Sequence, residues 1–150
     1  MNSEFNIAVH CLLFLYTRDD MMANSEQIAC SVSTHPARVR KVLSLLRKQG
    51  YVETKEGVGG GYHLTISLDD ITMGDLYRLF ALGSLQRGWC SGSEESPCLV
   101  SSNMQSAMEL IFKGGEDRLV AYFDEIKLSD VHRLLKKCDT EDGVRRGRGV

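Results

Sequence analysis

The sequence predicts a mainly α-helical fold with one small β-hairpin: a winged helix-turn-helix followed by a long C-terminal dimerisation helix. Three observations predict it. Two short helical segments flank a tight turn within residues 25–49, a glycine-rich hairpin pattern follows at 51–66, and a long segment at 102–126 is apolar on more than one side. The organisation expected from these patterns is a winged helix-turn-helix domain over 1–85, a cysteine-containing loop over 86–102, a dimerisation helix and short closing helix over 103–137, and a disordered tail over 138–150.

Local patterns mark the first helix and the start of the second. Residues Phe5–Tyr16 carry apolar side chains at helical spacing, which predicts a helix. Asn24 is followed three residues later by Gln27, the spacing of a capping box, in which each side chain accepts the backbone N–H of the other residue. A second helix is therefore expected over residues 25–32.

The turn and the third helix complete the helix-turn-helix pattern. Ser33 occupies the turn, Thr34 is expected to cap the third helix, and Pro36 falls in its first turn, where a missing N–H costs little. Gly50 is expected to end this helix. The side chains expected to pack the two helices together are Ile28, Ala29, Val32, Val39 and Val42.

A glycine-rich hairpin directly follows the third helix. Tyr51–Thr54 and Tyr62–Ile66 have the composition of strands, and glycines dominate the segment between them. A nucleotide-binding P-loop would need a Gly-Lys-Ser/Thr ending and a following helix, but Gly61 is followed by the strand-like YHLTISL. The pattern therefore predicts a wing, whose bare glycines allow close approach to another backbone.

The C-terminal half is expected to contain a helix, a loop and a long helix. Residues 70–85 have helical periodicity, and the long helix is expected from about Ser102 to Ile126, where Gly114 and Gly115 would permit a kink or break. Because apolar residues cover more than one side of the long helix, it must pack against its own domain and against a second surface. The residues expected at a dimer interface are Met104, Met108, Ile111, Phe112, Leu119, Tyr122, Phe123 and Ile126.

Positive charge is concentrated in the segment that holds the third helix and the hairpin. The whole chain has a net charge of −2, but residues 34–63 contain six Lys or Arg against two Glu, a net charge of +4. A basic stretch in an acidic protein is typical of a surface that contacts double-stranded DNA, although a solvated helix face has the same composition. The candidate DNA-binding residues are Ser25, Thr34, His35, Pro36, Arg38, Val39, Arg40, Lys41, Lys55, Gly59, Gly60, Tyr62 and His63.

The candidates at the start of the third helix have different expected roles. Arg38 is the candidate for a bidentate contact with guanine in the major groove. Arg40 and Lys41 are expected to meet phosphates, which set affinity rather than sequence choice. Thr34 and His35 are candidates for either a base or a phosphate.

Two other classes of function fit the sequence less well. A small thiol oxidoreductase using Cys90 and Cys98 would have a C-x-x-C motif at a helix start within a βαβ pattern, and neither is present. No Ser/His/Asp arrangement or pair of carboxylates stands out, so the chain is not expected to be an enzyme. A protein–protein module is the third class, but it would not require the positive segment. A steep fall of affinity with salt would separate DNA binding from both.

The segment from the third helix through the hairpin resembles the Rrf-two (Rrf2) family of bacterial winged-helix regulators, which includes iron–sulfur cluster assembly, nitric-oxide-sensing and cysteine-metabolism regulators. The family pattern is a helix ending in L-R-K-x-G-[LYI]-V and a wing with G-x-G-G-G-Y, which residues 46–52 and 57–62 match. His35–Lys41 and Ile126–Val131 are similar to the start of its recognition helix and to the segment after its dimer helix. The resemblance covers about residues 3–135. It implies a homodimeric repressor whose long helices cross and whose operator is palindromic.

One wing position departs from the family pattern. Many members have Arg immediately before the first wing glycine, available to the minor groove, whereas this chain has Glu56. Because phosphates repel a carboxylate, either Lys55 or His63 is expected to substitute, or the wing contributes little to sequence choice.

The five cysteines and the N-terminus indicate a reducing compartment and a candidate sensor. The N-terminus lacks a signal-peptide pattern and its apolar run is too short to span a membrane, so we expect a cytoplasmic location, no membrane partner and no permanent disulfide.

In the iron–sulfur members three cysteines precede the dimer helix, but here only Cys90 and Cys98 do, and Met104 stands where a third would be sought. No cofactor or metal is therefore expected, because an iron–sulfur cluster would be short of ligands. Three alternatives stay open: a redox-sensing thiol switch at Cys90 and Cys98, a metal or iron–sulfur site completed by another residue, and no sensory role.

Overall fold

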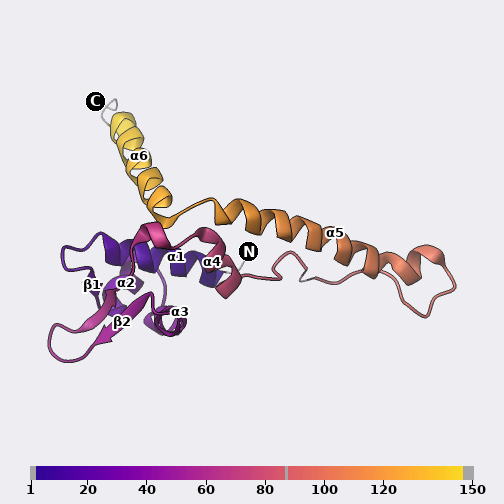
Figure 1. Ribbon diagram of the computed structural model, residues 1–150, viewed down its shortest axis with the longest axis horizontal. Helices are drawn as coiled ribbons and strands as arrows, with labels where there is room; N and C mark the ends of the chain where they lie inside the picture. Colours follow the sequence, from indigo (N-terminus) through magenta and orange to yellow (C-terminus); the bar gives the residue numbers. More distant parts are fainter. Residues whose placement is uncertain (1–2, 87, 147–150) are drawn as a thin grey trace.

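The computed structural model describes residues 3–86 and 88–146 and has the expected mainly helical fold with a small antiparallel sheet (Figure 1). The elements in chain order are α1 (Ser3–Tyr16), β1 (Met22–Ala23), α2 (Ser25–Val32), α3 (Pro36–Lys48), β2 (Val52–Lys55), β3 (Gly61–Leu64), the 3-10 helix η1 (Leu68–Asp70), α4 (Met73–Phe80), α5 (Leu99–Asp124) and α6 (Leu128–Arg146). Elements α1 to α4 and the sheet form a body, from which α5 and α6 project in different directions.

Local hydrogen bonds form the helix-turn-helix where the sequence indicates it. Asn24 and Gln27 make the predicted capping box: the Gln27 N–H lies 2.8 Å from Asn24 Oδ1, and the Asn24 N–H lies 3.0 Å from Gln27 Oε1. Ser33 ends α2 in the left-handed conformation, at φ 60°, and the Thr34 N–H then bonds the Ala29 carbonyl at 3.0 Å. The residues predicted to pack α2 against α3 are confirmed as core residues, Ile28, Ala29, Val39 and Val42 being buried and Val32 packed against them.

The cap of α3 is His35, and the expectation that Thr34 caps this helix is wrong. His35 has an extended backbone, with φ −74° and ψ 137°, and its Nδ1 accepts the Ala37 N–H at 3.2 Å. The reason lies in Pro36, the first residue of the helix, because a residue that precedes proline is driven out of the helical region and becomes the capping position.

The sheet contains a strand that the sequence does not reveal. Its order is β1-β3-β2, with β1 pairing Met22 to His63 and Ala23 to Tyr62. A two-residue strand is too short to show the alternation of apolar and polar residues from which strands are predicted, so the sequence pattern does not reveal it. Gly61 permits the pairing, because a Cβ there would lie 2.6 Å from the Ala23 carbonyl oxygen and the residue has φ 153°. Strands β2 and β3 form the predicted hairpin, within two residues of the expected bounds.

The hydrophobic core lies around α1, whose buried side chains contact α3, α4 and β3. The helix expected over residues 70–85 is shorter than predicted and is preceded by η1. It begins at Met73 because Thr72 and Asp75 form a second capping box, in which Thr72 Oγ1 accepts the Asp75 N–H at 3.1 Å and Asp75 Oδ2 accepts the Thr72 N–H at 2.9 Å. It ends at Phe80, and a long connection follows.

Helix α5 is a continuous rod, without the break that Gly114 and Gly115 would permit. It begins at Leu99 rather than at Ser102, so the cysteine-containing connection ends at Cys98. The connection runs out beside α5 to its far end, where the chain turns back into the helix (Figure 1). Only the C-terminal part of α5 lies on the body, where it packs against α4.

Helix α6 extends beyond the expected closing helix. The structure describes helix as far as Arg146, so the expectation of a disordered tail from residue 138 is wrong for residues 138–146, and residues 147–150 lie outside the described residues. Polarity alone does not prevent a helix, and no Gly or Pro interrupts residues 128–141. Within the described residues, no helix is both long and apolar enough to cross a membrane.

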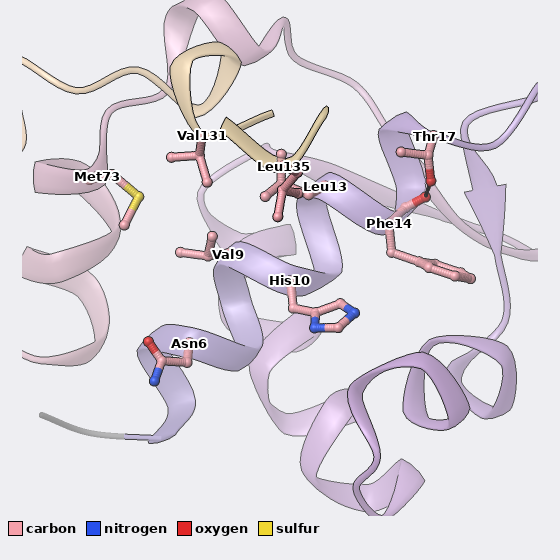
Figure 2. Close-up of a pocket in the computed structure, with 9 residues that line it drawn as sticks. All are labelled: Asn6, Val9, His10, Leu13, Phe14, Thr17, Met73, Val131 and Leu135. Atoms are coloured by element: carbon pink, nitrogen blue, oxygen red, sulfur yellow. Dashed lines mark hydrogen bonds between the residues drawn. The ribbon is translucent and has the colours of Figure 1, made fainter. Parts of the chain in front are cut away.

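An apolar groove of about 400 Å³ separates α1 from α6 (Figure 2). Val131 and Leu135 of α6 face Val9 and Leu13 of α1 across it. His10 lies at the side of the groove, where its Nε2 and Ser31 Oγ are 2.8 Å apart, and burial lowers the pKa of this histidine. The hydrogen bond joins α1 to α2, so it fixes the first helix of the helix-turn-helix to the core helix.

Candidate nucleic-acid interface and sensor loop

Helix α3 has one buried side and one exposed side. Val39, Val42, Leu43 and Leu46 have no exposed surface. Successive residues of a helix are turned by 100° about its axis, so residues 37, 41, 44 and 48 point away from the buried side. Residue 40 lies at the edge of this outward side. Ala37, Arg40, Lys41 and Lys48 are exposed and Ser44 is half-buried, so a short, basic, outward side is available to a groove of DNA.

Arg38 and Lys41 contact the start of α1. The Arg38 guanidinium donates to Ser3 Oγ at 2.7 Å, and Lys41 Nζ lies 2.6 Å from Glu4 Oε1. Arg38 therefore leans toward α1, to one side of the outward direction. Arg38 is exposed, but its guanidinium already bonds Ser3. The guanine contact expected of Arg38 stays a prediction.

Arg40 lies on the opposite edge, toward the start of α2. Its Nη1 is 3.3 Å from Ser25 Oγ and 3.9 Å from Glu26 Oε1, and about half of its side chain is exposed. Ser25 is buried and orients this arginine from inside the body. Val39 is completely buried, so the expectation that it contacts DNA is wrong: it belongs to the side of α3 that packs on the core.

The remaining candidates at the start of α3 are partly committed to the fold. His35 is exposed, but its Nδ1 accepts the Ala37 N–H, so a neutral ring carries its hydrogen on Nε2. Nε2 is then the atom through which His35 would donate to DNA. Thr34 and Pro36 are half-buried beside it.

The tip of the wing is rich in glycine and is flanked by charges of both signs. The Gly60 N–H closes the turn onto the Gly57 carbonyl at 3.0 Å, and a Cβ on Gly60 would lie 2.2 Å from the Lys55 carbonyl oxygen, so only glycine fits there. Lys55, Glu56 and Gly59 are exposed. Gly60 therefore has a clear structural role, and the contact of Gly59 and Gly60 with DNA stays a prediction.

The two candidates on β3 lie in the sheet rather than at the wing tip. Tyr62 is half-buried and packs against the core, opposite Ala23 and Thr54. His63 Nδ1 lies 3.3 Å from Glu53 Oε1 on β2, without the alignment of a hydrogen bond. His63 thus has an acidic neighbour, which opposes its expected role as a substitute for the wing arginine.

The two loop cysteines lie in different surroundings at the far end of α5. Cys98 is exposed and is the N-terminal cap residue of the helix, where the backbone N–H groups of Ser101 and Val100 lower the pKa of its thiol. Cys90 is half-buried. The connection folds back on the helix start, because the Ser93 N–H donates to the Ser101 carbonyl at 3.0 Å. The segment just after Cys90 is thereby held beside the residues just after Cys98.

The predicted dimer-interface residues have different surroundings along α5. Leu119 and Phe123 pack on the core of their own chain, Ile126 is half-buried, and Met104, Met108 and Phe112 face the connection across a pocket. Ile111 and Tyr122 are exposed, together with Leu110 and Val100, which the prediction does not include.

Sequence reasoning missed a buried polar contact between α5 and the body. Glu116 Oε1 accepts the Tyr77 hydroxyl at 2.9 Å and the Gly83 N–H at 2.6 Å. Burial, and then the carboxylate of Glu116, raise the pKa of Tyr77. A signal was present, because Glu116 interrupts the apolar run that Phe112, Leu119 and Phe123 form at helical spacing.

Comparison with known proteins identifies relatives of this arrangement. Residues 1–133 match the model of the Rrf2 family, described as an iron-dependent transcriptional regulator. The chain is 30% identical to the HTH-type transcriptional regulator YwnA of Bacillus subtilis over 136 residues, 90% of this chain and 98% of YwnA. It is 36% identical to the HTH-type transcriptional regulator NsrR of the same organism over 72 residues, 47% of this chain and 49% of NsrR. A crystal structure described as a transcriptional regulator from Lactobacillus plantarum superposes with a TM-score of 0.82 and 27% identity, covering 98% of this chain and 99% of the other.

The iron in the family description has no matching ligand set here. Among the described residues, no group of three His, Cys, Asp or Glu side chains is placed to hold a metal ion. Cys90 and Cys98 are two thiolates, and an iron–sulfur cluster is held by four protein ligands. The described residues of this chain therefore do not fit an iron centre of that kind.

Proposed function

The chain belongs to the Rrf2 family of transcriptional regulators, which are not enzymes, and from that premise we propose that it acts in the cytoplasm as a homodimeric repressor on a palindromic operator. The observation that carries this proposal is the outward side of α3, where Arg40, Lys41 and Lys48 are exposed while the opposite side is buried. Thiol oxidation in the loop before α5 is the proposed signal.

We assign the principal base contact to Arg40 rather than to Arg38. Arg40 lies one turn after Ala37, whose small side chain lets the start of the helix approach the bases, and its contact with Ser25 is long at 3.3 Å. Arg38 is held by Ser3 at the flank, where a phosphate contact suits it better. This reverses the roles expected from sequence order alone, because position around the helix decides which side chain enters the groove.

The dimer is proposed to form on the free side of α5. Leu110 and Ile111 are 74% and 64% exposed, and Tyr122 is exposed on the same rod about three turns later. An exposed apolar stripe of this kind marks an interaction surface. A two-fold axis across it would pair the stripe with itself, and a palindromic operator would require the two α3 helices to lie on one side of the dimer.

The proposed signal acts first at Cys98. Its thiol is exposed and its lowered pKa increases the thiolate fraction that attacks peroxide. The sulfenic acid formed there condenses with the Cys90 thiol, so that two thiols and one peroxide give one disulfide and two waters. The disulfide would tether the connection at the end of α5.

Operator binding by two arginine variants tests the DNA-binding proposal. Arg40→Ala should cost about 1–3 kcal/mol on the selected operator and relax the preference at one base position. Arg38→Ala should weaken all sequences nearly equally and reduce the dependence of log K on log salt by about one. The measurement is binding to operator and scrambled duplexes over a salt series. Loss of sequence preference in Arg38→Ala but not in Arg40→Ala would restore the opposite assignment.

Cysteine variants test the signal. Cys98→Ser should bind the operator normally when reduced and lose the response to peroxide, and Cys90→Ser should form no intrachain disulfide. Cys30→Ser is the matched control, because Cys30 is also exposed but lies on α2, outside the loop. An undiminished peroxide response in Cys98→Ser would refute the thiol switch.

A further inference from the structure

A pocket of about 680 Å³ lies between α5 and the connection that precedes it. Its apolar lining residues are Leu85, Trp89, Met104, Met108 and Phe112. Its polar lining residues are Gln86, Ser91, Gln105 and Glu109. Its volume falls within the range of pockets that hold small organic ligands, and apolar side chains combined with a few polar groups are typical of such pockets. The exposed Leu110 and Ile111 do not line it.

The wall of this pocket contains one nucleophile. Cys90 lines it beside Trp89, whereas Cys98 does not line it and lies exposed at the helix start. The two thiols of the loop are therefore accessible to different reagents: Cys98 to anything dissolved in water, and Cys90 best to a molecule that first occupies the apolar pocket.

The side chains of the walls favour an aromatic molecule. Met104 and Met108 follow each other on one side of α5, and methionine side chains adapt to irregular ligands and contact aromatic rings favourably. Trp89 is 90% exposed, so its indole is free to stack on such a ring. Phe112 closes the same side one turn after Met108.

We propose that this pocket binds an apolar quinone and presents it to Cys90 for covalent addition. The Cys90 thiol adds to an unsubstituted ring carbon, forming a carbon–sulfur bond as the electron pair of the carbon–carbon double bond moves onto the carbonyl oxygen. The thiol proton and the displaced ring hydrogen end on the two oxygens. The product is a hydroquinone thioether that contains every atom of both reactants, so no other oxidant or reductant is consumed.

The first test compares two reagents at the two cysteines. The full-length protein is treated with a methyl-substituted naphthoquinone or with iodoacetamide, and the adducts at Cys90 and Cys98 are quantified by peptide mass spectrometry over time. The ratio of the Cys90 rate to the Cys98 rate should be about tenfold higher with the quinone, because apolar contacts concentrate it at Cys90. An equal ratio with both reagents would overturn the proposal.

A wall variant with a matched control locates the effect. Met108→Gln has nearly the same length and helix propensity but makes the wall polar, so it should return the quinone ratio to the iodoacetamide value. Lys113→Gln changes an exposed residue of the same helix outside the pocket lining and should leave the ratio unchanged. A Met108→Gln ratio equal to that of the unmodified protein would show that the pocket is not the cause.

Trp89 reports binding without reaction. It is the one tryptophan of the chain and lies in the pocket wall, so bound quinone should quench its fluorescence. In Cys90→Ser, where addition is blocked, quenching by the naphthoquinone should saturate and reverse on dilution, and adding Met108→Gln should weaken it about tenfold. Linear, unsaturable quenching in Cys90→Ser would mean collisions only and would contradict the proposed site.

Any effect of Cys90 addition on operator binding rests on the proposed function, but the quinone site itself does not. If the unmodified protein fails to bind any operator, the proposed function falls while Cys90-selective addition can still be observed. If operator binding is normal and Cys90 shows no selectivity for the quinone, the pocket proposal falls alone. Release of the operator on Cys90 addition, absent in Cys90→Ser, would support both.

Discussion

The body formed by α1–α4 and the rod formed by α5 distribute their apolar side chains in opposite ways. In the body Leu12, Leu43 and Leu46 have no exposed surface, whereas Leu110 and Ile111 on α5 are largely exposed. In α5, which the structure describes in full, the one buried residue is a carboxylate, Glu116. The body thus completes its own core, while the rod has apolar surface left over, and this difference locates the interaction surface that the sequence pattern can only imply.

The largest expected effect is a cavity in the body. Leu43→Ala removes a completely buried side chain from α3 and should lower the free energy of unfolding by about 2–5 kcal/mol. Leu82→Ala, at a residue 53% exposed just after α4, is the control and should change it by about 0.5 kcal/mol or less. Urea denaturation at fixed protein concentration checks both, and equal effects would abolish the contrast between core and surface leucines.

The next effect separates the rod from the body. Ile111→Glu places a charge in the proposed dimer surface and should raise the dimer dissociation constant by about tenfold or more, because an unpaired charge is costly to bury. The thermal unfolding of the body should change little, since Ile111 does not contact the core. Sedimentation velocity over a concentration series measures the dimer, and an unaltered dimer in this variant would place the interface elsewhere.

The junction between the two regions should show a smaller, coupled effect. Tyr77→Phe removes a donor to Glu116 and Glu116→Gln removes the charge, and each should cost about 1–3 kcal/mol of stability. Since the two groups bond each other, the double variant should lose less than the sum of the single losses. A strictly additive result would show that the hydrogen bond does not couple rod to body.

The smallest effect is a pH dependence within the body. Burial lowers the pKa of His10 below its ordinary value of 6.5, so the unfolded chain takes up this proton first as the pH falls. Stability should therefore decrease as the pH falls from about 6.5 through the pKa of the folded state, and His10→Gln should flatten that part of the profile. Denaturation midpoints between mildly acidic and neutral pH provide the measurement.

The sequence predicts the body well because its signals are local. The capping box at Asn24, the turn at Ser33 and the wing glycines depend on neighbours within a few residues, and the structure confirms each. The strand β1 was missed because it exists only through pairing with β3. The cap at His35 was missed because the effect of the following proline outweighs the preference for threonine.

Predictions that depend on direction around a helix were less successful. Val39, Arg38 and Arg40 are adjacent in sequence, but one points into the core and the others lie on opposite flanks of α3. The same limit applies to α5, where Met108 and Ile111 were placed in one interface, but Met108 lines the pocket against the connection and Ile111 is exposed outside it. A periodic pattern shows that a helix has several apolar sides. Only the tertiary structure shows which segment packs against each side.

The unbroken course of α5 through Gly114 and Gly115 has a mechanical consequence. From Glu116, where the helix is fastened to the body, to Leu99 the rise is about 26 Å at 1.5 Å per residue. A pivot of about 5° at the fastening point would then carry the far end through about 2 Å, a displacement typical of helix shifts in switching proteins. Because α5 stays helical through both glycines, it can act as one lever, so that the chemistry proposed at its tip and the orientation at its fulcrum are parts of one motion.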